Sequence, residues 1–381
     1  MDEATHSTVA ATGNPGVSVI IPTYNRSGLV GRALRSVMAQ TYRDFEVIVI
    51  DDASTDDTAQ VVVGFPGVRY LRNDTNLGGA ASRNRGIAAA RGDYVAFLDS
   101  DDEWLPHKLE LQVEAMVEDQ GVGAVYCGLY RQDDRTGLLK MGRPIMHRGN
   151  VRAALLAGWC PHTVSQFLVR RRSLEEVGGF DAELAGFQDT DLWIRLSQAG
   201  AFEALDEPLV ISHDHQGPRL TTNPTSRGVA IEQFLAKWEP DMLMTAGRRT
   251  AGAFRRRHLG DHLAFSVLAS LEAGERRRAL ADLGTYLRVT RARKPAQLGG
   301  LLLATVIGTE SYETVRSRWT RIGAARRAPV ASSPRPAGAW CLYDDGKAGH
   351  HPTYVGGLVE AAVAGGMHLQ VATPYPPPGT G

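Results

Sequence analysis

The sequence has few cysteines, and their spacing predicts neither a crosslink nor a metal cluster. Among 381 residues there are three cysteines, far apart in the chain. An odd number of widely separated cysteines excludes a disulfide framework and a structural zinc site. This usage is typical of a reducing compartment, so the sequence predicts a cytoplasmic protein. The three residues are Cys127, Cys160 and Cys341.

Long hydrophobic runs are also missing. The most apolar stretch, 298–308, is about half as long as the ~20 residues that a membrane-spanning helix needs. Residues 1–16 are polar and small, and they lack the charged start and apolar centre of a signal peptide. The chain is therefore predicted not to span a membrane, and residues 1–16 are predicted to form a flexible leader.

The chain has no overall excess of charge. Lys plus Arg and Asp plus Glu both number 42, so no net field attracts nucleic acid. The charges are unevenly distributed, because residues 248–330 hold 17 Lys and Arg against 6 Asp and Glu. A solvated helical face is the simplest explanation of this basic segment. The alternative is peripheral contact with anionic lipid on the cytoplasmic face of a membrane.

Short β-branched runs alternate with longer helical patterns between residues 17 and 127. This alternation predicts an α/β sheet with mainly parallel pairing. In open sheets of this kind ligands bind beyond the carboxyl ends of the strands, so residues that close each run are candidate site residues. Strands are expected at 17–22, 45–51, 68–72, 93–99 and 122–127, and helices at 27–40, 54–63, 80–90 and 105–119.

The composition of the second half of the chain changes several times. A strand is expected at 164–169, and an arginine-rich helical region at 248–327. Residues 328–338, APVASSPRPAG, have the composition of a linker. Residues 339–381 then repeat the strand, helix, strand arrangement once, which is too little core to fold alone.

The first acidic cluster follows the second expected strand. Ser54 with Asp57 fits a capping box at the start of the next helix, so these two residues have a structural explanation. Asp52 has no such explanation. It stands where a strand-end carboxylate accepts hydrogen bonds from a nucleobase or a ribose.

A second acidic cluster, Asp99-Ser100-Asp101-Asp102, ends the fourth expected strand. Three carboxylates within four residues repel one another unless a cation or solvent relieves the repulsion. Hard oxygen donors suit Mg²⁺ or Mn²⁺, which take one or two carboxylates together with phosphate oxygens and water. The alternative is a helix cap, which explains one acid and leaves the others unexplained.

The segment QDTDLWIRL holds the third acidic feature. Asp189 opens a helix, where it either caps that helix or acts as a general base. Asp191 and Arg195 stand four residues apart and are expected to form an ordinary surface pair. Only Asp189 is therefore a candidate for chemistry here.

Two weaker features complete the list of candidates. Gly78-Gly79 permit close backbone approach, and the helix that follows them suits a phosphate. His213 and His215 follow a strand, although a lone histidine is more often a surface or core residue than a metal ligand. No Walker loop, GxGxxG fingerprint, HExxH or GxSxG motif occurs, which removes the commonest P-loop, dinucleotide, zinc-protease and hydrolase functions.

Taken in order, the motifs VSVIIPTYN, DD, NLGGAASRNRG, YVAFLDSDD, VGGFD and QDTDLWIRL resemble those of family 2 glycosyltransferases. The resemblance covers residues 17–217. It implies an α/β domain at 17–247 with the GT-A nucleotide-diphospho-sugar transferase fold, a doubly wound mixed sheet, followed by the helical region. It also implies an inverting, metal-dependent enzyme that moves a sugar from a nucleotide diphosphate to a hydroxyl of a glycan, lipid-linked or small-molecule acceptor.

The resemblance assigns a role to each candidate. Asp52 matches the acid that recognises the pyrimidine, and Asp189 matches the base, although Gln188 replaces the family's usual glutamate beside it. Asp101 matches the acid that meets the Mg²⁺ or Mn²⁺ ion, with Asp99 near the metal and the ribose. The implied nucleotide-binding residues are Pro22, Thr23, Tyr24, Asp52, Gly78, Gly79, Asp99 and Ser100. The implied metal ligands are Asp99, Asp101 and His215, with His213 as the second choice of histidine.

Other interpretations remain open at this point. Receiver-like phosphoacceptor domains also place paired acids at strand ends, but the region up to Ser212 is too long for one. A glycosidase would use two facing carboxylates, and an inactive sugar-nucleotide binder would keep the site without turnover. Residues 339–381 resemble the first βαβ unit of GT-B glycosyltransferases. In the first domain, residues 217–223 are expected to act as a lid on the acceptor side.

Overall fold

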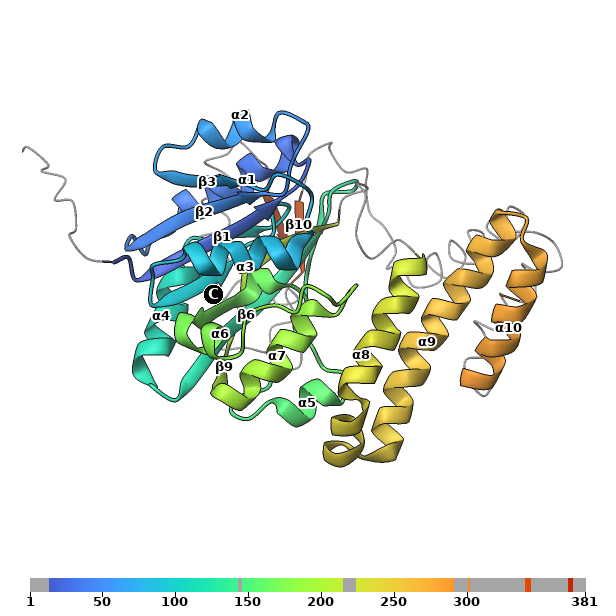
Figure 1. Ribbon diagram of the computed structural model, residues 1–381. Coiled ribbons are helices and arrows are strands. Elements are labelled where there is room, and N and C mark those ends of the chain that lie inside the picture. The colour runs from blue at the N-terminus through green and yellow to red at the C-terminus, as the bar shows by residue number, and fades with distance from the viewer. Residues whose placement is uncertain are drawn as a thin grey trace, which may run out of the picture. The chain divides into compact units, whose positions relative to one another are not determined.

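The structure, a computed structural model, describes most of the chain up to residue 290 and short pieces beyond it (Figure 1). The described residues are 14–142, 146–214, 224–290, 301, 340–343 and 369–372. They fall into two compact units. The first contains residues up to 152 with 160–182 and 188–214, and the second contains 153–159, 183–187 and the chain from 215 onward. Most of the predicted leader, the lid at 217–223 and the linker at 328–338 lie outside the described residues.

One mixed sheet forms the centre of the first unit. Its strand order is β3-β2-β1-β4-β8-β6-β9-β5, with β7 beside β6. The pairs β1–β2, β2–β3, β1–β4 and β6–β9 are parallel, whereas β4–β8, β6–β8, β5–β9 and β6–β7 are antiparallel. The strands are β1 (Val17–Thr23), β2 (Phe45–Asp51), β3 (Val68–Arg72), β4 (Tyr94–Phe97), β5 (Glu103–Trp104), β6 (Val122–Asp133), β7 (Leu138–Met141), β8 (Phe167–Arg170) and β9 (Ala201–Asp214). The α/β class and the mixed sheet are thus confirmed.

Helices follow the strands in the alternation that the sequence predicts. Helix α3 lies so close to β1 that a Cβ atom on Gly86 would stand 2.4 Å from Cγ2 of Ile20. Only a residue without a side chain fits there, and this close approach fixes the helix over the sheet. The helices of this part of the chain are α1 (Ser27–Met38), α2 (Thr58–Val63), α3 (Gly79–Ala89), α4 (Lys108–Glu118), α5 (Arg152–Leu156), α6 (Arg171–Glu176) and α7 (Gln188–Ala199).

Two local predictions were wrong. The strand expected at 164–169 begins as a 3-10 turn, η1 (Val164–Gln166), because Thr163 and Gln166 form a capping box there. The capping box expected from Ser54 and Asp57 does not form. Helix α2 begins at Thr58 without a side-chain cap, and the Ser54 hydroxyl instead accepts the backbone N–H of Asn25 at 2.9 Å. Asp56 contacts both sides: its Oδ1 accepts the Thr58 N–H at 3.1 Å, and its Oδ2 accepts the N–H of Ser27, the first residue of α1, at 3.0 Å.

An aromatic stack packs α7 onto the sheet. The rings of Phe167 on β8 and Trp193 on α7 stack with centroids 3.6 Å apart, and Phe202 meets Trp193 edge-on at 6.5 Å. Trp193 is fully buried. Aromatic side chains bury a large apolar area each, so this stack fixes the position of the helix that Asp189 opens.

A buried lysine at the start of α4 packs against β5. Lys108, the first residue of α4, is fully buried; its ammonium lies 4.0 Å from the centroid of the Trp104 ring and donates to Oε1 of Gln112 at 2.6 Å. Burial lowers the pKa of Lys108 from 10.5 to about 8. Trp104 in turn donates its indole N–H to the carbonyl of Ser165 at 2.9 Å. The lysine therefore supports the segment that carries the acidic cluster.

The second unit contains three long helices, α8 (Pro224–Thr245), α9 (Gly247–Glu272) and α10 (Arg276–Thr290). Leu263, Val267, Leu283 and Tyr286 form part of its apolar core. An aromatic cluster of Phe187, Phe234, Phe254 and His258 is a second packing centre. None of the helices in the described residues is long and apolar enough to cross a membrane.

The described C-terminal pieces are two short strands. β10 (Trp340–Tyr343) and β11 (Leu369–Ala372) pair in parallel, with Trp340 opposite Leu369 and Tyr343 opposite Ala372. Parallel pairing is what a βαβ unit requires, and the residues between the two strands lie outside the described ones. The proposal of a further domain that begins at residue 339 rests on this pairing and on the sequence pattern.

We predict that Lys108 makes the free energy of unfolding rise with pH in the alkaline range. Because the folded state releases the proton near pH 8 and the unfolded chain near 10.5, the unfolded state binds more protons between these values, and stability increases by roughly 3 kcal/mol across this window. The Lys108→Met variant should lose this increment in urea unfolding measured from pH 7 to 10.5.

The exposed lysine variant Lys140→Met is the matched control and should keep the slope of the parent protein. Parallel curves for Lys108→Met and the parent over the whole range would contradict the prediction.

Candidate functional site

The candidate site lies at the carboxyl ends of β2, β1 and β4, which are neighbours in the sheet. The loops that leave these strands are joined to one another. Asp52 N–H donates to the carbonyl of Thr23 at 2.8 Å, and Leu98 N–H donates to the carbonyl of Ile20 at 3.0 Å. The residues predicted after each strand are thereby brought to one edge of the sheet.

Asp51 is a structural residue. It is fully buried, and its carboxylate accepts the Ser54 backbone N–H at 2.8 Å, the Tyr70 hydroxyl, and Nη1 of Arg72 at 3.1 Å. These donors come from β3 and from the loop after β2. These donors hold the strand ends together, and because the Asp51 side chain is completely buried it is not accessible to a ligand.

Asp52 holds the glycine turn. Its Oδ1 accepts the N–H of Leu77 at 2.9 Å and Nδ2 of Asn73 at 2.7 Å, and its Oδ2 accepts the N–H of Gly78 at 2.8 Å. Gly78 has a φ of 87°, a conformation that favours glycine, and Gly79 then begins α3. The predicted nucleotide residues Asp52, Gly78 and Gly79 are therefore in direct contact, although Asp52 is only 4% exposed.

The PTYN motif follows β1 at the same edge. Thr23 is buried, and its hydroxyl has no hydrogen-bond partner within the described residues. Tyr24 is 45% exposed, and Pro22 is half-buried. Asn25, with a φ of 50°, accepts the Thr55 N–H at 2.8 Å, which joins this loop to the one after β2. Pro22, Thr23 and Tyr24 thus lie where a nucleobase is predicted to bind.

The acids after β4 form a hydrogen-bonded cluster. Asp99 accepts Nη2 of Arg83 at 2.5 Å on one oxygen and the Thr163 hydroxyl at 3.1 Å on the other. Asp102 is buried and accepts the Ser165 hydroxyl at 2.7 Å, and its Oδ2 lies 3.1 Å from Oγ1 of Thr163, whose single proton it shares with Asp99. Burial, followed by the charges of Asp99 and Asp101, raises the pKa of Asp102 to about 7.

Backbone hydrogen bonds position the other residues of the Asp99–Asp102 segment. Ser100 is buried, and Asp101 is half-buried, with its carbonyl accepting Nη2 of Arg32 at 2.9 Å. The Asp102 N–H donates to the carbonyl of Asp99 at 3.0 Å, so the four residues form a turn. The side chains of Asp99 and Asp102 both bond Thr163, which places them on one side of that turn.

Asp189 lies in the first turn of α7 and shares its surroundings with the acidic cluster. Burial raises the pKa of Asp189, and the charge of Asp99 raises it further, whereas the Thr190 N–H and the Arg83 guanidinium lower it. Arg83 therefore acts electrostatically on both Asp99 and Asp189. The predicted base and the predicted metal-binding motif are close enough in space to affect each other.

Sequence reasoning missed Arg83, Thr163 and Ser165. Arg83 stands four residues after Gly79, one turn along α3, inside a motif noted only for its glycines. Ser165 lies in the segment 164–169 that was expected to be a strand, and Thr163 directly precedes it, so neither hydroxyl was recognised as a hydrogen-bond donor to the acids. The T-x-x-Q spacing from Thr163 to Gln166 was the available signal, because it predicts a capped turn at that point.

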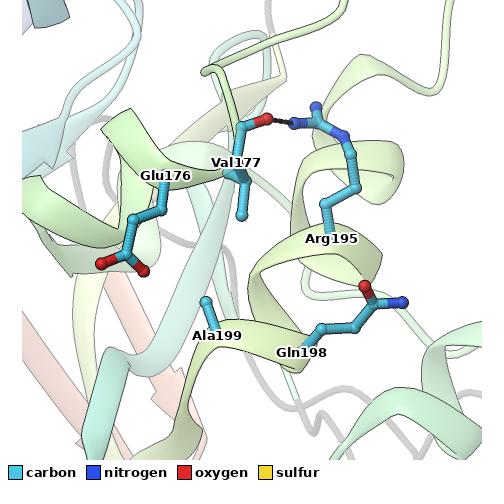
Figure 2. Close-up of a pocket in the computed structure, with 5 residues that line it drawn as sticks. All are labelled: Glu176, Val177, Arg195, Gln198 and Ala199. Atoms are coloured by element: carbon cyan, nitrogen blue, oxygen red, sulfur yellow. Dashed lines mark hydrogen bonds between the residues drawn. The ribbon is translucent and has the colours of Figure 1, made fainter.

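The spacing predicted a surface pair of Asp191 and Arg195. The pair forms, but it is not on the surface. Asp191 is fully buried and accepts Nε and Nη2 of Arg195 at 2.9 and 2.6 Å. Arg195 also donates to the carbonyl of Val177 at 2.6 Å, which ties α7 to the end of α6 (Figure 2). The burial follows from the neighbouring Trp193 and Leu192, both in the core.

A pocket of about 330 Å³ lies beside the C-terminal half of α7, whereas Asp189 is in the first turn of this helix; Figure 2 shows the residues that line the pocket. Asp189 and Ala199 are ten residues apart on this helix, roughly 15 Å at 1.5 Å per residue. This pocket is therefore distinct from the candidate site. It is lined by Glu176, Val177, Arg195, Gln198 and Ala199.

Of the two candidate metal-binding histidines, the structure describes only His213. His215 lies outside the described residues. His213 is buried, with Nδ1 2.6 Å from Oδ1 of Asp134 and Nε2 2.7 Å from Oε1 of Glu103. Burial alone would lower the pKa of His213, but the two carboxylates raise it above its ordinary value. Both ring nitrogens are occupied, so His213 joins β9 to its neighbours and is not free to ligate a metal.

The fold as a whole is similar to that of solved nucleotide-sugar enzymes. S. aureus TarS 1–349, solved in complex with UDP-GlcNAc, matches with a TM-score of 0.50 and 19% sequence identity over 74% of this chain and 92% of that chain. The likeness establishes the architecture: a mixed α/β sheet of the GT-A glycosyltransferase class, with helices after it.

The sequence comparisons identify the family. The model for glycosyl transferase family 2 matches residues 18–178. The amylovoran biosynthesis glycosyltransferase AmsB of Erwinia amylovora is 33% identical over 208 residues, 51% of this chain and 69% of that protein. The chondroitin synthase of Escherichia coli is 31% identical over 199 residues, 51% of this chain but only 28% of the relative. The chain belongs to glycosyltransferase family 2 and is a glycosyltransferase.

Proposed function

We propose that this enzyme transfers a sugar, with inversion, from a nucleotide diphosphate to an acceptor hydroxyl, and that it needs a divalent cation to do so. One observation carries the proposal. Arg83 pairs with Asp99 after β4, and the charge of the same guanidinium lowers the pKa of Asp189 in the first turn of α7. A donor and an acceptor can thus be held on either side of one reacting carbon.

The donor side is supported by the loops after β1, β2 and β3. The orphaned Thr23 hydroxyl is a buried polar group for which a bound nucleotide supplies a partner. The N-terminus of α3, which begins at Gly79, offers backbone N–H groups to a phosphate. Asp52, held against the turn at Gly78, is the proposed partner of the base, and UDP, dTDP and GDP are the candidate nucleotides.

The donor set fits Mg²⁺ or Mn²⁺. Within the described part of the chain no group of three or more histidine, cysteine or acid side chains is arranged to hold a metal ion. Two carboxylates of the Asp99–Asp101 motif together with phosphate oxygens satisfy such an ion, and the Asp99 side chain is 28% exposed. Asp99 and Asp101 would hold the ion, with His215 as the proposed third ligand. A bound cation neutralises the charge that develops on the departing diphosphate.

Asp189 is the proposed base. The acceptor oxygen attacks the anomeric carbon as the bond from that carbon to the phosphate oxygen breaks, and the acceptor proton passes to Asp189. A single displacement on the face opposite the leaving group inverts the configuration and forms no covalent intermediate. The raised pKa of Asp189 suits a group that must take up a proton at neutral pH.

The acceptor is proposed to be a growing polysaccharide, a lipid-linked sugar or a small molecule. The names of AmsB and chondroitin synthase support a role in polysaccharide biosynthesis. The end of α8 and the start of α9 support peripheral contact with anionic lipid, because Met244 is 79% exposed and the exposed Arg248 and Arg249 follow it.

We expect the double variant Arg248→Gln/Arg249→Gln to sediment with phosphatidylserine vesicles at least ~3-fold less than the parent, because each basic residue near an anionic surface contributes about 1 kcal/mol. The control Arg276→Gln/Arg277→Gln changes two exposed arginines of α10. Equal sedimentation of the Arg248/Arg249 variant and the parent would remove the membrane proposal.

Replacing the base should separate binding from turnover. UDP-GlcNAc, UDP-glucose and GDP-mannose are screened with p-nitrophenyl glycoside acceptors, and the fastest pair is kept. For this pair we expect Asp189→Asn to lower kcat by at least ~100-fold while donor affinity by calorimetry stays within about twofold of the parent, because only proton transfer is lost. The exposed acid variant Asp57→Asn is the control. Parent-like turnover by Asp189→Asn would exclude the base assignment.

Removing a metal ligand should act on donor binding as well. In the presence of Mn²⁺ we expect Asp101→Ala to bind the donor at least ~10-fold more weakly than the parent, and chelation should weaken the parent to the same extent, because the diphosphate loses its counterion. Asp74→Ala, an exposed acid of the neighbouring loop, is the control. If fully loaded Asp101→Ala transfers sugar as fast as the parent, the metal scheme is wrong.

A further inference from the structure

One oxygen of the Asp189 carboxylate is already occupied. Its Oδ1 accepts the backbone N–H of Thr190 at 2.7 Å and lies 3.4 Å from the Thr190 hydroxyl. Thr190 is only 7% exposed, and it is held in the core side of α7 next to Asp191. Both contacts fall on Oδ1, so Oδ2 is the oxygen that is left for a proton.

The Thr190 hydroxyl has a second neighbour. Its Oγ1 lies 3.4 Å from Sγ of Cys160, in the segment before η1. Burial raises the pKa of Cys160, and the Asp189 charge raises it further, so the group remains a thiol at neutral pH. A hydroxyl has one proton to donate and two lone pairs to accept with. The one hydroxyl proton of Thr190 has two acceptors within reach, Sγ of Cys160 and Oδ1 of Asp189, and an ionised carboxylate is the stronger acceptor of the two.

We propose that Thr190 is the positioning residue of the base: its hydroxyl, together with its backbone N–H, fixes Oδ1 of Asp189 so that Oδ2 faces the acceptor. This inference rests on the proposed role of Asp189. Thr190 touches no substrate and acts through its neighbour. The contact of 3.4 Å is long, as hydrogen bonds of a catalytic group often are before the substrate is bound.

The Thr190 hydroxyl affects the protonation of Asp189 alongside the charged groups that surround this carboxylate. Arg83 from α3 stabilises the carboxylate form, whereas Asp99 after β4 destabilises it. Cys160, as a neutral thiol, adds no charge. The Thr190 hydroxyl donates to the ionised form alone, so its removal makes Asp189 easier to protonate.

The test compares kcat, KM and pH profiles of the assay pair for Thr190→Val, Thr190→Ser and the exposed control Thr245→Val. We expect Thr190→Val to lower kcat about 5- to 30-fold, to leave the donor KM within twofold, and to move the acidic limb of the kcat profile up by about 0.5 to 1 pH unit. Thr190→Ser, which keeps the hydroxyl, should restore kcat to within about threefold of the parent. Thr190→Ala replaces the valine variant if that one does not fold.

Parent-like kcat and an unmoved limb for Thr190→Val overturn the inference, as does a serine variant that is as slow as the valine one. The two proposals fail separately. If Asp189→Asn is inactive and Thr190→Val is unchanged, only the positioning role is wrong. If Asp189→Asn is as active as the parent, the base assignment and the positioning role are both wrong.

Discussion

The neutralisation of the carboxylates at the end of β4 is the constraint on which the site depends. Asp99 and Asp102 stand three residues apart at the edge of a buried sheet, where like charges repel strongly. The structure relieves this repulsion with one guanidinium, from Arg83, and two hydroxyls, from Thr163 and Ser165. Because these donors come from α3 and from the turn before β8, the charge balance also fixes how those elements meet.

The fold supplies these partners through its mixed topology. The parallel strands β2, β1 and β4 bring the loops of Asp52 and Asp99 to one edge. The antiparallel strand β8 then runs beside β4 and delivers Thr163 and Ser165 to the acids from the other direction. An all-parallel sheet would place the start of β8 at the opposite edge. The change from parallel to antiparallel pairing is therefore what builds the site.

Much of this could be predicted from the sequence, because it depends on local pattern. Strands β1 to β4 and the carboxylates that follow β2 and β4 were predicted from β-branched runs that end in acids, whereas the short strand β5 was not. The hydrogen-bond partners of Asp99 were not predicted. Arg83 is 16 residues from Asp99 in the sequence and Thr163 is 64 residues from it, and no periodicity predicts a contact at such a separation. Burial of Asp191 was missed for a related reason: spacing predicts the pair with Arg195 but not the side of the helix that faces the core.

The placement of Arg83 limits how the site can be dissected. One guanidinium serves as counterion to Asp99 and also lowers the pKa of Asp189. Removing it leaves two acids uncompensated at once, so the effects of substitutions at these three positions cannot be summed. Any rate change in an Arg83 variant is a property of the three groups together, and only a full set of single, double and triple replacements would divide it among them.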